Sequence, residues 1–222
     1  MLQPGLIVSC QAREDNPLHG PHFMAAMARA AAQGGAAGLR ANGPADIRAL
    51  KASTDLPVIG IIKSELEGYE VIITPDFAHA LAVAEAGADV IALDATARRH
   101  PDGTARDLIV RVKRELGVPV FADVATFDEG IAAAEAGADY VATTLSGYTS
   151  DTQVPPGEGP DLALLERLCA ALDVPVVGEG RFETPEQVAA AFALGAFAVV
   201  VGTAITNPRE ITRRFARAVP PR

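Results

Sequence analysis

The amino-acid sequence predicts a (β/α)8 barrel, the TIM-barrel fold, in which residues 1–222 form a single α/β domain. Strand-like and helix-like patterns alternate along the whole chain, as they do in proteins with a parallel sheet. A helix-to-strand passage also repeats: Ala-Glu-Ala-Gly-Ala-Asp occurs at 84–89 and at 134–139, and 193–197 is a looser copy. No G-x-G-x-x-G follows the first apolar run, which disfavours a dinucleotide-binding sheet. Repeated units of similar length favour a closed barrel over an open sheet.

Eight runs rich in apolar and β-branched residues are the predicted strands. In the third run, Val58, Ile59, Ile61 and Ile62 would be buried on both faces, and the run ends on Lys63. The predicted strands are residues 6–11, 37–41, 58–63, 90–94, 118–124, 140–145, 176–179 and 198–202.

Alanine-rich amphipathic segments between these runs are the predicted helices. Asp76 is expected to cap the third helix, and Gly87 and Gly137 can take the left-handed conformation that ends a helix. The stretch 154–160, rich in proline and glycine, is expected to be a loop between a strand and a helix. The predicted helices are residues 22–33, 45–51, 76–85, 104–116, 128–135, 161–172, 185–194 and 209–218.

Charge and composition narrow the possible partners. The formal net charge is −9 and the isoelectric point is near 4.9, so neither nucleic acid nor a membrane surface is expected as a partner. A phosphorylated metabolite is compatible with an acidic protein, because backbone N–H groups and one or two arginines can hold phosphate. No apolar run reaches the roughly 18 residues of a membrane span, and the first residues do not resemble a secretion signal. The two cysteines form no disulfide framework or metal cluster, so we expect a cytoplasmic protein without a bound metal.

Polar side chains stand at the C-terminal ends of the predicted strands. In a barrel these positions face one mouth, where barrel enzymes carry out their chemistry. Lys63 is unusual after an apolar strand, since lysine is seldom buried unless paired or used, although by itself it could merely lead into the loop 64–69. The whole set predicts a site for a small polar anion. Its members are Gln11, Arg40, Asn42, Lys63, Asp94, Asp123, Thr143, Thr144, Glu179, Arg181, Gly202 and Thr203.

The ends of the seventh and eighth strands indicate a phosphate site. Gly180 and Arg181 follow the seventh strand and Gly202 and Thr203 the eighth, where barrel enzymes commonly bind phosphate. Glycine lets backbone donors approach the phosphate oxygens, and arginine can add a bidentate contact. The alternative, that the glycines only form tight turns, stays open.

The strand-end segments together resemble the N-acetylmannosamine-6-phosphate 2-epimerase family. The resemblance rests on GLIVSCQA at 5–12, GLRANG at 38–43, PVIGIIK at 57–63, ITP at 73–75, ALDAT at 92–96, AD at 122–123, TTLSGYT at 143–149, GEGR at 178–181 and GTAIT at 202–206. These segments cover nearly the whole chain in the family's order.

The resemblance implies a TIM-barrel enzyme that interconverts N-acetylmannosamine 6-phosphate and N-acetylglucosamine 6-phosphate in sialic acid breakdown. It implies that Lys63 is the acid/base and that Glu179 is its carboxylate partner. It further implies that no cofactor is needed and that the protein is a homodimer. The predicted substrate-binding residues are Gln11, Arg40, Asp123 and Thr144, and the predicted phosphate-binding residues are Gly180, Arg181, Gly202 and Thr203.

Three features depart from the family pattern. One is Asp76, which stands where relatives commonly carry threonine and which we expect to cap a helix without affecting activity. Relatives often carry an arginine where this chain has Asn207, so one anion contact is missing, and Arg181 or Arg209 could replace it. Glu65 and Glu67 stand in the loop where a basic residue often follows the lysine.

Several questions remain open from the residues alone. Burial and the charge of Arg40 would lower the pKa of Lys63, whereas Glu179 or Asp123 would raise it. The last helix, with Ile211 on its apolar stripe, could cover its own barrel or pack against a partner subunit. The rival functions are another phosphate-binding barrel enzyme, such as a thiamine-phosphate or indole-glycerol-phosphate synthase, and a sugar-phosphate sensor without catalysis.

Overall fold

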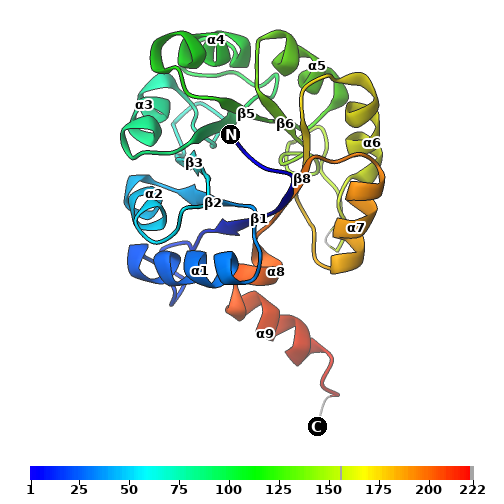
Figure 1. The fold of residues 1–222 in the computed structure, drawn as a ribbon. Helices are drawn as coiled ribbons and strands as arrows, with labels where there is room; N and C mark the ends of the chain where they lie inside the picture. The colour runs from blue at the N-terminus through cyan, green and yellow to red at the C-terminus, as the bar shows by residue number, and fades with distance from the viewer. Residues whose placement is uncertain (156, 221–222) are drawn as a thin grey trace.

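The computed structural model describes residues 1–155 and 157–220. Within them, eight parallel strands form a closed barrel in the order β1 to β8, surrounded by helices (Figure 1). This arrangement confirms the predicted (β/α)8 fold. The strands are β1 Gly5–Cys10, β2 Gly38–Asn42, β3 Val58–Ile61, β4 Val90–Asp94, β5 Val120–Asp123, β6 Tyr140–Ala142, β7 Val176–Glu179 and β8 Ala198–Val201.

The helices alternate with these strands. They are α1 Pro21–Gln33, α2 Pro44–Lys51, α3 Phe77–Glu85, α4 Ala105–Leu116, α5 Phe127–Glu135, α6 Leu162–Ala171, α7 Pro185–Ala193, α8 Thr203–Thr206 and α9 Pro208–Arg217. The short α8 was not predicted. No helix of the described residues is long and apolar enough to cross a membrane. Residues 221–222 of the predicted domain and residue 156 of the predicted loop lie outside the described residues.

The apolar residues form two layers. Inward-facing strand residues such as Ile7 and Phe121 fill the barrel, whereas outward-facing ones such as Val8 pack against the helices. The N-terminal end of the barrel is closed by Leu2, whose backbone N–H donates to the hydroxyl of Tyr140 at 3.1 Å. The packed interior therefore leaves the C-terminal end for polar residues.

Five strands end before their predicted last residue at the mouth: β1, β5 and β8 by one residue, and β3 and β6 by two and three residues. β3 ends at Ile61, because Lys63 pairs with Ile73 in an isolated antiparallel bridge instead of continuing the parallel ladder. β6 ends at Ala142, because the chain turns and Ser146 N donates to the carbonyl of Thr143 at 3.1 Å. Apolar character alone does not show where a strand leaves its sheet.

The predicted helix ends are confirmed at three positions. The Asp76 carboxylate accepts a hydrogen bond from His79 N at 2.9 Å and caps α3. Gly87 and Gly137 have φ angles of 89° and 97°, in the left-handed region that glycine adopts without steric cost.

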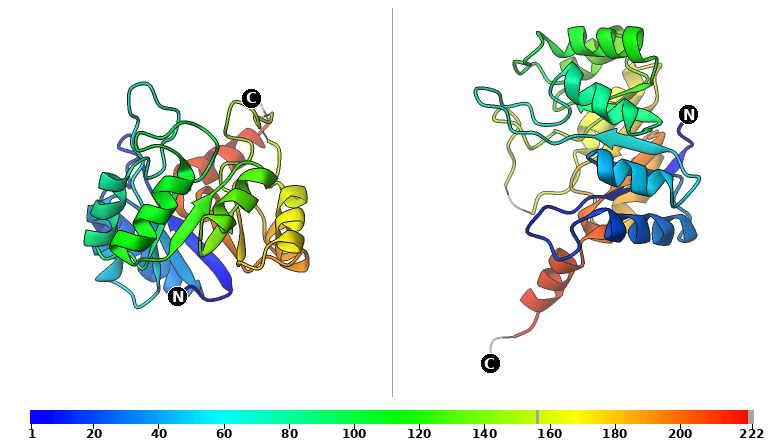
Figure 2. Two further views of the ribbon diagram at one scale, coloured as in Figure 1. Left: turned by 90° about the horizontal axis from the view of Figure 1, so that it is seen from above. Right: turned by 90° about the vertical axis from the view of Figure 1, so that its left-hand side faces the viewer.

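Helix α9 extends away from the barrel (Figures 1 and 2). It has no buried residue, and Phe215 and the following Val219 are 76% and 68% exposed. Of the two alternatives for this helix, covering its own barrel is therefore wrong for the isolated chain.

Candidate active site

An open cavity of about 780 Å³ lies at the C-terminal end of the barrel. Figure 2 shows this end, with its long loops, opposite the N-terminus. Arg40 and Asp123 lie beneath the cavity and are 1% and 0% exposed. The other residues predicted to act in catalysis or to bind sugar or phosphate line it: Gln11, Lys63, Thr144, Glu179, Gly180, Arg181, Gly202 and Thr203. Of the remaining strand-end residues, Asn42 lines the cavity, whereas Thr143 and Asp94 are buried and do not. In the described part of the chain, no three His, Cys, Asp or Glu side chains are grouped as metal ligands.

Strand alternation explains why these side chains meet. Val177 points into the barrel, so Glu179, two residues later on β7, also points inward. The same spacing relates Lys63 to the buried Ile61 of β3. Because all strands run in one direction, their last inward-facing residues form one polar layer above the apolar core.

A buried arginine joins two carboxylates at the centre of this layer. Nη1 and Nη2 of Arg40 donate to Oδ1 and Oδ2 of Asp123 at 3.0 and 2.6 Å, and Nη1 also donates to Oε2 of Glu179 at 2.5 Å. The Thr144 hydroxyl donates to Oδ1 of Asp123 at 2.5 Å. The guanidinium carbon lies 5.4 Å from the centroid of the Phe121 ring. Arg40 is thus fixed on several sides and orients Glu179 toward the cavity.

Lys63 is positioned through its backbone. Its N–H donates to Oδ1 of Asn42 at 2.8 Å, and the next residue, Ser64, donates its N–H to the carbonyl of Ile72 at 3.0 Å. The returning segment includes Thr74, whose φ of 46° is unusual for a β-branched residue. The Lys63 side chain is then free to reach into the cavity.

Asp94, another predicted strand-end residue, has a different environment. It is fully buried and does not line the cavity. Its carboxylate accepts hydrogen bonds from the Thr96 hydroxyl and from Nη2 of Arg98, both at 2.6 Å. Arg98 also donates to the carbonyl of Glu70 at 3.0 Å. Asp94 therefore holds the loop that follows Lys63, through Arg98.

The protein environment brings the pKa values of Lys63 and Glu179 closer together. Burial raises the pKa of the Glu179 carboxyl to about 7; Arg40 opposes this shift and Asp123 adds to it. The Lys63 side chain remains accessible through the open cavity, yet the surrounding protein displaces enough water to lower the pKa of its ammonium group. Arg40 lowers that pKa further, and Glu179 acts in the opposite direction. The balance that the sequence left open therefore lies toward a lowered pKa for Lys63.

The two glycine segments form the other side of the cavity. Gly180 has a φ of 100°, and a Cβ there would lie 3.3 Å from the carbonyl oxygen of Thr144. A Cβ on Gly202 would lie 3.3 Å from the Cβ of Ser9. Both glycines line the cavity and leave little room for a side chain, and their binding of phosphate stays a prediction.

The Arg181 guanidinium is occupied by the protein itself. Its Nε donates to the carbonyl of Gly159 at 2.7 Å, and its Nη1 donates to the carbonyl of Ser146. Both carbonyls belong to the loop between β6 and α6. The predicted contact of Arg181 with phosphate stays a prediction.

Two arginines that line the cavity are not among the site residues predicted from the sequence. Arg13 lies on the loop after β1, and Arg214 lies on α9. Both are outside the strand-end positions that were considered. Arg13 is two residues beyond Gln11, so extending the strand alternation past the end of β1 would have selected it.

Comparisons with known proteins agree over nearly the whole chain. The family described as "Putative N-acetylmannosamine-6-phosphate epimerase" matches residues 24–220. A protein of Caldanaerobacter subterraneus subsp. tengcongensis, described as "Putative N-acetylmannosamine-6-phosphate 2-epimerase", is 51% identical over 216 residues, which are 96% of this chain and 90% of that protein. A protein of Clostridioides difficile with the same description is 47% identical over 214 residues, 96% of this chain and 95% of its own length.

Solved structures give the same result. The N-acetylmannosamine-6-phosphate 2-epimerase from Clostridium perfringens superposes with a TM-score of 0.91 at 45% identity, covering 96% of this chain and 93% of that one. Thiamine phosphate pyrophosphorylase from Pyrococcus furiosus superposes with a TM-score of 0.61 at 18% identity, covering 95% and 90% of the two chains. The second match shows a shared fold alone.

A parallel barrel whose mouth holds a lysine, a glutamate of raised pKa and glycine-lined backbone defines a TIM-barrel enzyme of the proton-transfer class. The three relatives at 45 to 51% identity each match 96% of this chain. The chain belongs to the N-acetylmannosamine-6-phosphate 2-epimerase family, as its strand-end motifs predicted.

Proposed function

We propose that this chain inverts C2 of N-acetylmannosamine 6-phosphate to give N-acetylglucosamine 6-phosphate, in the breakdown of sialic acid and other amino sugars. The carrying observation is that Lys63 and Glu179 face one cavity above a single buried arginine. Family membership supports the choice of substrate. A charged phosphate ester does not cross a bilayer readily, so we place the reaction in the cytoplasm.

The charges around Arg40 explain how two groups can exchange one proton. With Asp123 and Glu179 both ionised, Arg40 balances one carboxylate and leaves one negative charge. A proton on Lys63 or on Glu179 compensates that remaining charge. The lowered pKa of Lys63 and the raised pKa of Glu179 bring these two arrangements closer in free energy.

Epimerisation uses this exchange at the carbon next to the carbonyl of the open-chain sugar. Lys63 moves the C2 proton: the neutral amine takes it, and the resulting ammonium returns a proton to the opposite face of the enediolate. Glu179 hydrogen-bonds the sugar hydroxyls and stabilises the end where the enediolate forms. General acid–base catalysis of this kind contributes about 10²–10⁴-fold.

The remaining residues bind and orient the substrate. Gln11 and Thr144 line the cavity and contact the sugar. Arg40 and Asp123 are covered, so their influence on the sugar passes through Glu179 and Thr144, which they hold by hydrogen bonds.

Direct turnover tests the proposal. Purified protein incubated with N-acetylmannosamine 6-phosphate in heavy water should give N-acetylglucosamine 6-phosphate carrying deuterium at C2, followed by NMR. Binding of the sugar phosphate without turnover would favour the sensor. Neither binding nor turnover would favour a different barrel enzyme.

The raised pKa of Glu179 predicts a pH-dependent stability. Folding raises the pKa of this carboxyl from about 4.5 to about 7, so the folded protein holds the proton more tightly than the unfolded chain. Its contribution to the free energy of unfolding is complete below pH 4.5 and is lost as the pH rises through about 7. We expect the wild type to lose up to about 3 kcal/mol between pH 4.5 and 8 relative to Glu179→Gln, which cannot titrate there. Urea unfolding at both pH values measures this difference. An unfolding free-energy difference that is equal at the two pH values would contradict it.

We also propose that the chain is a homodimer and that α9 packs against the second copy. On its apolar stripe Ile211 is half-buried, whereas Phe215 and the following Val219 are exposed in one chain. The helix also carries four of the chain's basic residues, whereas the net charge is −9, so a second copy is electrostatically complementary to it.

Phe215→Glu is therefore expected to convert dimers to monomers, because it places a charge in the proposed apolar contact. Thr212→Glu, an exposed change on the same helix, is the matched control and should remain dimeric. Light scattering after size-exclusion chromatography measures the mass. A monomeric wild type, or a Phe215→Glu variant that stays dimeric, would refute this arrangement.

A further inference from the structure

We infer that Arg13, on the loop after β1, is the arginine that binds the phosphate group of the substrate. The inference rests on the proposed function for the identity of the substrate and adds the residue that recognises its charge. It depends on three features of the cavity: which arginines are already occupied, how the loop is held, and where Arg13 stands relative to the glycine segments.

Among the described residues, four arginines line the cavity, and three of them are occupied by oxygen atoms of the protein. Arg181 donates to two loop carbonyls. Arg209 donates to the side chain of a loop aspartate at 3.1 Å, and Arg214 donates to a glutamate at 2.8 Å. The Arg13 side chain forms no hydrogen bond or ion pair within residues 1–155 and 157–220, and it is exposed. All of its donors are available to a ligand, whereas each of the other three arginines uses at least one nitrogen within the protein.

The loop that carries Arg13 is fixed although the side chain is not. Asn16 N donates to the carbonyl of Arg13 at 2.9 Å, which closes a turn. Asn16 Nδ2 donates to Oδ1 of Asn207 at 3.3 Å, at the start of α9. Arg209 adds a second link, from α9 to Asp15. An anion binding to Arg13 therefore orders one side chain and no backbone, which keeps the entropic cost of binding low.

Arg13 also lies on the side of the barrel that carries the predicted phosphate site at Gly202. β1 pairs with β8, whose C-terminal end is followed by Gly202. The Thr206 hydroxyl donates to the carbonyl of Ser9 at 2.8 Å, which joins the segment after β8 to the end of β1. Arg13 therefore follows the strand next to Gly202, whose backbone lines the cavity, and a phosphate there would meet backbone donors and a guanidinium together.

The alternative is that Arg13 acts at the reacting end of the sugar. Burial and Arg40 are the larger causes of the lowered pKa of Lys63, but Arg13 contributes to it as well. A contact with phosphate exists throughout the reaction and changes substrate affinity, whereas a contact with the enediolate exists only during the chemical step and changes kcat. The two roles are therefore separable by kinetics.

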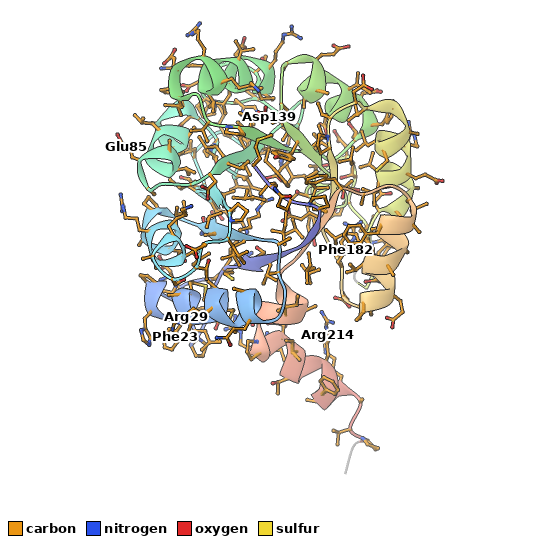
Figure 3. All side chains as sticks on the ribbon, viewed as in Figure 1. Phe23, Arg29, Glu85, Asp139, Phe182 and Arg214 are labelled. Carbon is orange, nitrogen blue, oxygen red and sulfur yellow. The ribbon has the colours of Figure 1, made fainter. Side chains whose placement is uncertain are left out.

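The experiment compares Arg13→Met and Arg13→Lys with Arg29→Met. Arg29 is exposed on α1, does not line the cavity and carries the same charge (Figure 3). Calorimetry measures the Kd of N-acetylglucosamine 6-phosphate and of unphosphorylated N-acetylglucosamine, and steady-state kinetics give KM and kcat. We expect Arg13→Met to weaken binding of the phosphorylated sugar about ten- to a hundredfold, with kcat changed less than about twofold.

The other variants should behave differently. Arg13→Lys should recover part of the affinity for the phosphorylated sugar. Arg29→Met should bind both sugars like the wild type, and Arg13→Met should bind the unphosphorylated sugar like the wild type. The inference is overturned if Arg13→Met binds like the wild type, if Arg29→Met loses as much affinity, or if kcat falls while KM is unchanged. It is also overturned if the wild type binds the phosphorylated sugar no more tightly than the unphosphorylated one. Affinity that depends on Arg13 without turnover would support the inference while rejecting the proposed epimerase.

Discussion

Replacing Lys63 with methionine is expected to reduce deuterium entry at C2 about 10²–10⁴-fold in heavy water. Methionine has a similar length and no amine, so the cavity keeps its shape and loses the proposed base. Glu179 would remain in place, because Arg40 donates a hydrogen bond to its carboxylate. NMR measures the rate at which deuterium replaces the hydrogen at C2. Each epimer is tested separately, because a second base would still exchange the C2 hydrogen of one epimer without inverting it.

Lys113→Met is the matched control for this variant. Lys113 contacts Asp139 at 2.8 Å and does not line the cavity, so exchange in this variant should equal that of the wild type. Undiminished exchange in Lys63→Met would end the role of Lys63 as the base.

Replacing Arg40 with methionine is expected to produce the largest loss of stability. It leaves Asp123, fully buried, and Glu179, 13% exposed, without their shared cation. Breaking a buried ion pair from one side costs about 3–5 kcal/mol, which for a chain of this size lowers Tm by about 10 °C. Thermal unfolding measures it, and the same variant should lose activity because Glu179 is no longer oriented.

Lys51→Met provides the comparison. It breaks an ion pair with Asp89 whose two side chains are each 33% exposed, and such pairs contribute at most about 1 kcal/mol. The double variant Arg40→Met, Asp123→Asn should regain part of the lost stability, because it removes the uncompensated buried charge. Equal losses for Arg40→Met and Lys51→Met, or no recovery in the double variant, would show that the buried cluster does not stabilise the fold in this way.

Much of the candidate site was predictable because a barrel converts sequence spacing into spatial proximity. Lys63 and Glu179 lie far apart in the chain, yet each stands at the inward-facing position after an apolar residue of its strand. Parallel strands bring these positions to one mouth. The same reasoning failed for Asp94, which is an inward strand-end residue but binds Arg98 and supports a loop.

The boundaries of the strands were less predictable for a related reason. Val58 to Ile62 read as one apolar run, but Asn42 and the returning segment at Ile73 take over the hydrogen bonding beyond Ile61. These partners come from other parts of the chain. A run of residues carries no information about which distant group will compete for its backbone.

The sequence by itself determined the order of strands and helices, the closed parallel topology and the identity of the polar side chains at the mouth, because these depend on local periodicity and strand direction. Only the tertiary structure decided that Arg40 is shared between Asp123 and Glu179, that the pKa of Lys63 is lowered, and that the Arg13 side chain faces the cavity with no hydrogen-bond partner among the described residues. The physical reason is that electrostatic energies depend on distances and on the exclusion of water across the barrel, and folding alone sets both.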